Sequence, residues 1–359
     1  MRQIEGFRLS SQQGHLWLLR KHGGDHVSQC TVSLEGECRV DLFEAALRAV
    51  IRKHEILRTR FDFLPGMDLP LQVIAEDCEF SSLRVDLTKT TTVGVGGEIE
   101  RLLEQQRRVD FDYVHGPLAR FLLLGSAPDR WLLAITLPAM CADSPSLENI
   151  VREIGRAYAA GLGSEPSDDQ EVIQYVQFSE WQNELLEAPE ADEGRRYWSQ
   201  KAVRDGAVST LPFEGFATAR PRSRSIIELE IGEQRAVAAE RAALEHGVSL
   251  QSVFLCCWGL LLGKLTDRSK LVLEVLFDGR SLEELAEGIG AFGKYIPILI
   301  RFRSGRPFAR ELKRVDALLR EAQKWEELFV PALENIEEGG CAIGFDFEHA
   351  GAPVSRRVT

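Results

Sequence analysis

The sequence has 359 residues, of which 44% are hydrophobic and 27% are charged, so we expect a folded chain long enough for two domains. A net charge of −12 argues against a general nucleic-acid surface or an anionic-membrane surface. No secretory signal, membrane-spanning run or Cys-x-x-Cys pair is evident, and seven cysteines in this pattern favour a reducing cytoplasm.

Apolar spacing predicts the elements of the first half. A helix is expected over residues 9–19, with Ser10 or Ser11 as its N-cap. A weakly alternating strand, an amphipathic helix and a second strand are expected over residues 27–35, 41–53 and 121–124.

A strand, a loop and a helix between residues 131 and 154 form the centre of the predicted fold. Residues 131–137 are a nearly continuous apolar run, which is typical of a strand covered on both faces. Ser144 and Pro145 predict the helix start, as N-cap and first helical residue, because apolar residues then follow at helical spacing. Such junctions place side chains and free N–H groups at a sheet edge, so the loop at 138–143 is a candidate site.

The second half is expected to follow a polar, turn-rich stretch at residues 164–170, which divides the chain into domains 1–168 and 169–359. Helices are predicted around Tyr175 and Tyr197. The apolar run within residues 249–265 predicts a buried helix, and a strand over residues 270–277 follows it, ending in a Gly-Arg turn.

Several motifs resemble those of condensation domains of nonribosomal peptide synthetases. Residues 9–17 are similar to that family's Leu-Ser/Thr-x-x-Gln-x-x-Leu-Trp motif, and residues 52–61 are similar to Arg-His-Glu-x-Leu-Arg-Thr-x-Phe. Three further segments resemble Phe-Asp-x-x-x-Gly-Pro-Leu, Tyr-x-Asp-Phe/Tyr-x-x-Trp-Gln and the first half of Ile-Gly-x-Phe-Val-Asn-Thr: residues 111–118, 175–182 and 289–295. The resemblance covers nearly the whole chain, from Leu9 to about Phe347.

The same family carries His-His-x-x-x-Asp-Gly in the loop after the central strand. Laid on this sequence, the pattern places Pro138 and Ala139 at the two histidines, Asp143 at the Asp and Ser144 at the Gly. The family's second histidine is thought to position or deprotonate the attacking amine, which alanine does not do. The related heterocyclisation pattern Asp-x-x-x-x-Asp-x-x-Ser matches at Asp143 and Ser146, but Pro138 stands at its first Asp. Ala139 is therefore a degenerate base position.

The resemblance implies an α/β fold of two chloramphenicol-acetyltransferase-like lobes in a V-shaped arrangement, with a channel between them. Relatives continue beyond the point that matches Phe347, so the second lobe is expected to be truncated. In the family, phosphopantetheine arms of peptidyl or acyl carrier proteins bring donor and acceptor into the channel. Neighbouring synthetase domains and a tailoring enzyme are the other expected partners. We expect no directly bound cofactor or metal, because no residue cluster shows metal-ligand spacing.

The resemblance gives Asp143 a structural role, as the partner of a buried arginine from the second motif. Arg58 is the expected partner and Arg60 the reserve; breaking such a pair costs roughly 3–5 kcal/mol. Cys141 is the other reactive side chain of the loop, and it would be a nucleophile only if a cation lowered its pKa. Free cysteines more often pack as small hydrophobic residues. Three histidines within or beside the motifs fall at no base position and are expected to pack or form hydrogen bonds: His15, His54 and His115.

Five residues are candidates for the channel and its substrates. Pro138 begins the loop, and Ser144 and Ser146 follow it at the expected helix start, where a serine ordinarily serves the helix itself. Lys294 and Tyr295 stand where the family has Asn and Thr, and the lysine could bind an acidic group. A basic cluster that could contact an acidic carrier protein, or could simply be solvated, comprises Arg220, Arg222 and Arg224.

Two functional hypotheses follow. The first is a condensation-like domain that lacks His-dependent amide-bond catalysis and serves as a docking platform for a carrier protein or tailoring enzyme. The second is an acyltransferase that still condenses carrier-bound thioesters with an amine, either by positioning alone or through a substituted group such as Cys141, Asp143 or a neighbouring histidine. The missing histidines favour the first hypothesis, and the intact remainder of the motifs favours the second.

Overall fold

The computed structural model describes residues 6–21, 26–76, 80–89, 92–163, 172–201, 226–303, 305–331 and 343–348. Its first sheet has the strand order β1-β6-β5-β4, in which β4 and β5 are parallel and the other neighbours are antiparallel. These strands are β1 (Val27–Glu35), β4 (Ser81–Asp86), β5 (Arg120–Ala127) and β6 (Arg130–Pro138). The three strands predicted in the first half are therefore confirmed as β1, β5 and β6.

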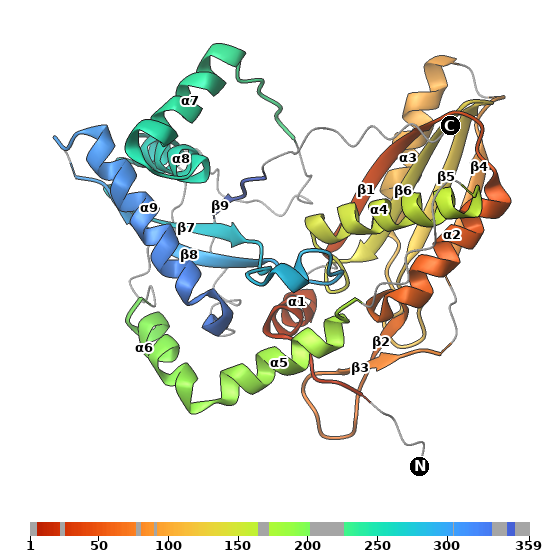
Figure 1. Cartoon of the computed structure of the whole chain (residues 1–359), viewed down its shortest axis with the longest axis horizontal. Helices are drawn as coiled ribbons and strands as arrows, with labels where there is room; N and C mark the ends of the chain where they lie inside the picture. The colour runs from red at the N-terminus through yellow and green to blue at the C-terminus, as the bar shows by residue number, and fades with distance from the viewer. Residues whose placement is uncertain are drawn as a thin grey trace, which may run out of the picture.

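The inner position of β6 explains its continuous apolar sequence. Helices α2 (Val40–Lys53) and α4 (Ser144–Gly161) pack on one face of the sheet, and α3 (Thr92–Arg108) packs on the other (Figure 1). Ile135 belongs to the core on the α2 and α4 side, whereas its neighbour Ala134 packs in the cluster that contains Leu102 of α3. Successive side chains of β6 point to opposite faces, so helices on both faces require an apolar residue at every position.

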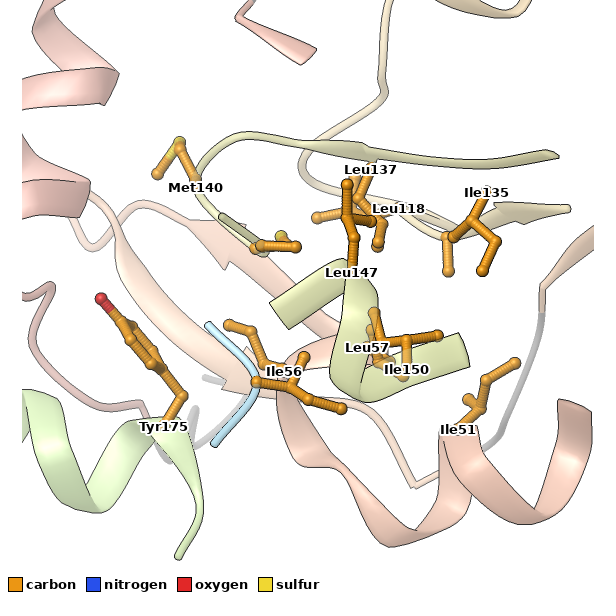
Figure 2. Close-up of a cluster of buried hydrophobic side chains, with 14 of the residues drawn as sticks. Ile51, Ile56, Leu57, Leu118, Ile135, Leu137, Met140, Leu147, Ile150 and Tyr175 are labelled. Carbon is orange, nitrogen blue, oxygen red and sulfur yellow. The ribbon is translucent and has the colours of Figure 1, made fainter. Parts of the chain in front are cut away.

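The core between β6 and its covering helices is drawn in Figure 2. Leu147 and Ile150 of α4 lie close to Ile135 and Leu137 of β6, and Ile51 of α2 lies on the far side of α4. Each of these side chains is at most 5% exposed. Burial of one such side chain contributes about 1.5–3 kcal/mol, so this contact fixes where α4 begins relative to β6.

Two further elements adjoin this core: helix α1 (Ser11–Lys21) and a hairpin of β2 (Thr59–Asp62) and β3 (Leu71–Ile74). The short turn η1 (Glu55–Arg58) directly precedes β2 in the chain. Ser10 Oγ accepts a hydrogen bond from Gln13 N (3.1 Å), so Ser10 caps α1. The buried amide of Gln13 donates to Gln72 Oε1 (2.9 Å) and to Met140 O (3.2 Å). These bonds fix α1 against both the hairpin and the loop after β6.

A second region is built on the three-stranded sheet β8-β7-β9. Strands β7 (Lys270–Phe277) and β8 (Lys294–Arg301) are antiparallel, and β9 (Gly344–Phe345) is parallel to β7. These strands share one hydrophobic core with helices α7 (Glu233–His246), α8 (Leu250–Thr266) and α9 (Phe308–Lys324). The predicted strand at 270–277 is confirmed as β7.

The apolar helix α8 is buried on one face only. Leu255 and Leu262 lie in the core, whereas Leu261 and Leu265 are 47% and 44% exposed. The prediction of a buried helix is therefore wrong for its outer face, because the described residues leave nearly half of each of these two side chains exposed. Within the described part of the chain, no single helix passes the length and hydropathy test for a membrane span; α7 and α8 pass it only as a pair bent by 109°.

Helices α5 (Tyr175–Glu187) and α6 (Asp192–Lys201), with the turn η2 (Pro189–Ala191), link the two regions along the chain. Tyr175 and Phe178 of α5 nevertheless belong to the first core. The domain division at 168/169 stays a prediction. The turn-rich residues 164–170 and the basic cluster of Arg220, Arg222 and Arg224 lie outside the described residues.

Residues 278–293, which connect β7 to β8 and include the turn η3 (Glu283–Leu285), are called the bridging segment below. Figure 1 shows this segment next to α1, between the two sheets. Leu285, Ile289 and Phe292 of the bridging segment pack in the first core rather than in the second. The segment therefore joins the second sheet to the loop after β6.

Candidate functional site

Asp143 ends the loop between β6 and α4 and is the N-cap of α4. Its Oδ1 accepts hydrogen bonds from Ser146 N (3.0 Å) and Ser146 Oγ (2.6 Å). The sequence predicted Ser144 as the N-cap, and this is a correction: Ser144 is the first helical residue and is exposed. A carboxylate suits the N-cap because it also interacts favourably with the positive end of the helix dipole.

The Asp143 carboxylate also binds a buried arginine. Arg280 of the bridging segment donates from Nη2 to Oδ1 (2.7 Å) and from Nη1 to Oδ2 (2.9 Å), and its side chain is only 3% exposed. Burial lowers the pKa of Arg280, but the hydrogen bonds and negative charges of Asp143 and Asp278 together outweigh this effect and raise that pKa above its ordinary value. Two parallel N–H···O bonds make this a strong, geometrically specific ion pair.

The prediction that Arg58 or Arg60 would pair with Asp143 is wrong. Arg58 instead donates to Ala75 O (2.7 Å) and lies 3.8 Å from Glu55, and Arg60 is part of β2. The bridging segment brings Arg280 to Asp143 because the chain turns at Gly279, whose φ is +70°. Only glycine fits at this turn, since an added Cβ would lie 2.1 Å from Phe292 O. The Gly-Arg turn was visible in the sequence, but no spacing tied it to a residue 137 positions away.

Backbone N–H groups of the bridging segment complete the coordination of Asp143. Phe292 N (3.0 Å) and Gly293 N (2.9 Å) both donate to Oδ2. In return, Asp143 N donates to Gly290 O (3.1 Å). Both carboxylate oxygens therefore accept three hydrogen bonds each from described residues, which leaves little capacity to accept a proton from a substrate.

Ser146, predicted as a possible substrate contact, is instead fully buried between the same partners. Its hydroxyl oxygen accepts from Gly290 N (2.9 Å) and Arg280 Nη2 (2.8 Å). Its hydroxyl hydrogen is donated to Asp143 Oδ1 (2.6 Å), and Gly290 O lies within reach as a second acceptor (2.8 Å). Ser146 thus holds the bridging segment on α4, which is a structural task.

Further hydrogen bonds fix the bridging segment on the first region. Asn149 of α4 donates to Gly288 O (3.2 Å), and the buried Tyr175 hydroxyl donates to Ala291 O (2.8 Å). The Gln12 amide donates to Phe292 O (3.0 Å). Elements from four parts of the chain meet here, so the candidate site is also the junction of the two regions.

The other end of the loop holds the two positions that are predicted to match the histidines of the family pattern. Pro138 is buried at the end of β6, opposite Val27 of β1. Ala139 is half-buried, and its N–H donates to His26 O (2.8 Å). Neither side chain can exchange a proton, so this end of the loop lacks the group that the pattern uses as a base.

Cys141 does not replace the missing base. Its side chain is fully buried, and burial raises the pKa of the thiol far above its ordinary value. The thiol therefore stays protonated and packs with Met140 and Ala142 as part of the core. Of the two roles considered for Cys141, the structure supports the small buried hydrophobic residue and not the nucleophile.

Lys294 is buried rather than exposed to a channel. Its Nζ donates to Glu326 O (2.8 Å) and to Glu327 Oε2 (3.1 Å), and its side chain is 1% exposed. Glu327 belongs to the turn η4 (Glu326–Leu328) after α9. The predicted role in binding an acidic group is therefore corrected to an internal ion pair. The adjacent Tyr295 is 48% exposed, and its predicted contact with substrate stays a prediction.

The histidines outside the loop occupy different environments. His54 is 2% exposed, and burial lowers its pKa to about 4, so it is a neutral packing residue. The His115 side chain is 80% exposed and lies 2.9 Å from Asp112. His15 is half-buried on α1, and burial lowers its pKa. The described residues contain no group of three or more His, Cys, Asp or Glu side chains placed to hold a metal.

The model of the condensation domain family matches residues 5–332. Chondramide synthase cmdD of Chondromyces crocatus is 30% identical over 327 residues, which are 89% of this chain and 8% of that protein. Bacitracin synthase 1 of Bacillus licheniformis is 23% identical over 318 residues, or 88% of this chain and 6% of that protein. The chain thus spans less than a tenth of these relatives.

Solved structures show the same fold. The first condensation domain of the calcium-dependent antibiotic synthetase superposes with a TM-score of 0.80 at 17% identity, over 95% of this chain and 80% of that one. The X-domain from teicoplanin biosynthesis, solved as a complex with OxyB, superposes with a TM-score of 0.77 at 20% identity, over 94% of this chain and 74% of that one. With the family match over residues 5–332, we conclude that this chain belongs to the condensation domain family of nonribosomal peptide synthetases.

Proposed function

We propose that this chain is a condensation-like domain of a peptide or hybrid polyketide assembly line that docks a carrier protein or tailoring enzyme and lacks His-dependent amide-bond formation. The observation that carries the proposal is the state of the loop between β6 and α4. Pro138 and Ala139 stand at the histidine positions, Cys141 is buried as a thiol, and Asp143 is fully engaged with Arg280, Ser146 and the bridging segment. No ionisable side chain of this loop is available to act as a base.

The two-lobe architecture expected from the family resemblance is part of this proposal. In this proposal the two regions correspond to two chloramphenicol-acetyltransferase-like lobes in a V-shaped arrangement. A carrier protein would insert its phosphopantetheine arm between them, near the bridging segment. The described contacts of Asp143, Ser146 and Tyr175 with that segment would keep the two lobes in register while the carrier is bound.

A docking role is compatible with what this fold does elsewhere. The X-domain of the same fold forms a complex with OxyB. A scaffold of this shape therefore offers enough surface for a second protein. For this chain, docking would use the fold that Asp143 and Arg280 hold together and would need no proton transfer.

The intact junction favours a second candidate, an acyltransferase that works by positioning. Asp143, Arg280 and Ser146 form a complete network, and a rigid channel that aligns a thioester with an amine supplies roughly 7–11 kcal/mol through effective molarity alone. In this mechanism the amine would attack the thioester carbonyl and lose its proton to solvent. The pantetheine thiol would leave as the amide forms.

A single-turnover assay separates the two candidates. The chain, in its natural polypeptide, would be mixed with donor and acceptor carrier proteins loaded with simple aminoacyl groups and followed by intact-protein mass spectrometry. Docking predicts no amide above the rate without the domain, together with a measurable carrier or tailoring-enzyme complex. Transfer that is unchanged in Ala139→His and abolished in Asp143→Asn, with both variants folded, would overturn the docking proposal in favour of the acyltransferase.

A further inference from the structure

The stretch from the end of β8 into α9 concentrates positive charge in an acidic chain. Residues 301–314 contain six basic side chains and one acidic side chain, although the whole chain has a net charge of −12. Five of the basic residues are exposed, and they are called the basic patch below: Arg301, Arg303, Arg306, Arg310 and Lys313. Such a local reversal of sign creates a field that attracts anionic groups to one place on the surface.

The packing of β8 and α9 brings the members of the basic patch together. Phe302 packs on the second core, and the arginines on either side of it are exposed. The Arg314 guanidinium donates to Arg301 O, which holds the first turns of α9 beside the end of β8. Arg310 and Lys313 are three residues apart on α9, so they share one face of the helix.

The carboxylates of this part of α9 lie inside the protein. The Glu311 side chain is 4% exposed and is bound by Arg314 (3.0 Å), with Arg306 at 3.8 Å. Asp316 is also buried and is bound by Arg320 (2.6 Å). Among the described residues, the other four members of the basic patch form no ion pair. Their positive charge therefore faces solvent without a counter-charge.

Helix α3 shows how this chain arranges the charges of an ordinary solvated helix. Arg101 lies 2.7 Å from Glu98, and both arginines at the end of the helix bind Glu104. Such pairs support a helix, whereas like charges three or four residues apart destabilise it. Arg310 and Lys313 also lie near the positive end of the α9 dipole, which disfavours cations. Folding alone therefore does not favour the basic patch.

The basic patch lies at the opposite end of the second sheet from the candidate site. In the pairing of β7 with β8, Phe277 and Lys294 are at the end next to the bridging segment, and Lys270 and Arg301 are at the other end. The strands separate these ends by about 23 Å, at 3.3 Å per residue. Figure 1 shows the bridging segment at one end of these strands and the first turns of α9 near the other. A partner bound at the basic patch is therefore distinct from a group held near the bridging segment.

The ligand chemistry that fits the basic patch is a carboxylate-rich protein surface. The planar guanidinium of arginine binds a carboxylate through two parallel hydrogen bonds. A helix with carboxylates on one face repeats them at the three- and four-residue spacing that Arg310 and Lys313 follow. A nucleic acid is also anionic, but a strand longer than the basic patch continues onto the surface of a chain whose net charge is −12 and is repelled there.

We propose that the basic patch is a docking surface for a partner protein that presents carboxylates on one face of a helix. The contact consists of ion pairs and hydrogen bonds, and no covalent bond forms or breaks. It depends on neither of the two candidate functions, because both use the junction at the other end of the second sheet. Docking at the basic patch would orient the partner on the second region.

The test uses the 359-residue chain and two fluorescein-labelled peptides of identical composition and equal helicity. One peptide carries its glutamates on one face of the helix, and the other has them distributed around it. Binding is measured by fluorescence anisotropy in about 0.15 M salt. The one-faced peptide is expected to bind about tenfold more tightly than the other, and the double variant Arg310→Glu with Lys313→Glu is expected to weaken it about tenfold.

The matched control is Arg101→Glu with Arg107→Glu on α3, which changes the net charge by the same amount on a different helix. Its effect is expected to stay within about twofold, because surface charges farther apart than the Debye length are screened. An equal loss in the two double variants, equal affinity for the two peptides, or tighter binding of single-stranded oligothymidine would each overturn the docking surface. Glutamate suits the first turns of α9, so the Arg310 and Lys313 variant is expected to fold. Should circular dichroism show that it does not, Arg310→Gln with Lys313→Gln takes its place.

Discussion

The loop between β6 and α4 has two ends with opposite properties. At the α4 end, Asp143 and Ser146 share hydrogen bonds with Arg280 and the bridging segment, and both match family patterns. At the β6 end, Pro138 and Ala139 stand at the positions predicted to match the family's histidines, and a backbone hydrogen bond from Ala139 N to His26 O fixes the chain there. A residue on which the fold depends cannot be removed without exposing a buried partner. A residue that serves only chemistry can change while the fold persists.

The largest test of this comparison is Asp143→Asn. The change removes the charge that compensates the buried Arg280 guanidinium, so we expect the free energy of unfolding to fall by about 3–5 kcal/mol, measured by urea denaturation. Asp112→Asn is the control: the Asp112 side chain is 56% exposed, and its loss should change stability by no more than about 0.5 kcal/mol. A loss below about 1 kcal/mol for Asp143→Asn would mean that the α4 end is no more structural than the β6 end.

The pH dependence of stability tests whether the buried His54 has a purely structural role. Burial lowers its pKa to about 4 in the folded state, against about 6.5 unfolded, so its contribution is complete above pH 6.5 and is lost as the pH falls toward 4. This amounts to about 3 kcal/mol, at 1.36 kcal/mol per pKa unit. The measurement is the stability of wild type minus that of His54→Gln across pH 4–7.

Glu326 changes the stability of wild type and of His54→Gln equally, so its opposing pH dependence cancels in the difference between the two proteins. Burial raises the Glu326 pKa to about 7, so its effect on stability is lost as the pH rises from 4.5 toward 7. A difference between wild type and His54→Gln that stays constant with pH would show that His54 does not titrate as a buried imidazole.

A double-mutant cycle distinguishes the observed partner of Asp143 from the predicted one. We expect Asp143→Asn and Arg280→Met to show a coupling energy of about 2 kcal/mol, because each change strands the same partner. The matched cycle with Arg58→Met should be additive within about 0.5 kcal/mol, since Arg58 binds Ala75 O instead. Comparable coupling in the two cycles would contradict the assignment of Arg280.

The smallest effect is expected at the β6 end. Ala139 is half-buried, so Ala139→His should change the free energy of unfolding by less than about 1 kcal/mol. The same substitution at Ala142, which is fully buried in the same loop, overpacks the core and should cost about 3 kcal/mol. Losses of equal size at the two positions would remove the distinction between a replaceable position and a structural one.

The sequence by itself predicted much of the local structure. The apolar run at 131–137 predicted β6. Apolar residues at helical spacing predicted the helices at 41–53 and after Ser144, because this spacing indicates which face of a helix is buried. The motifs around Trp17, Phe61 and Trp181 pointed to the condensation domain family, and the family match confirms it. The sequence also led to the prediction that Pro138 and Ala139 occupy the histidine positions of the family pattern.

Only the tertiary structure decided the partners of these residues. Arg280 rather than Arg58 pairs with Asp143, and Lys294 is buried against Glu327. Ser146 is buried and forms hydrogen bonds with Arg280 and the bridging segment. Periodicity and capping depend on neighbours within a few residues, and they say nothing about which of several arginines reaches a carboxylate 137 positions away. That choice follows from how the bridging segment packs into the first core, where Phe292 and Ile289 are buried and their backbone is brought to Asp143.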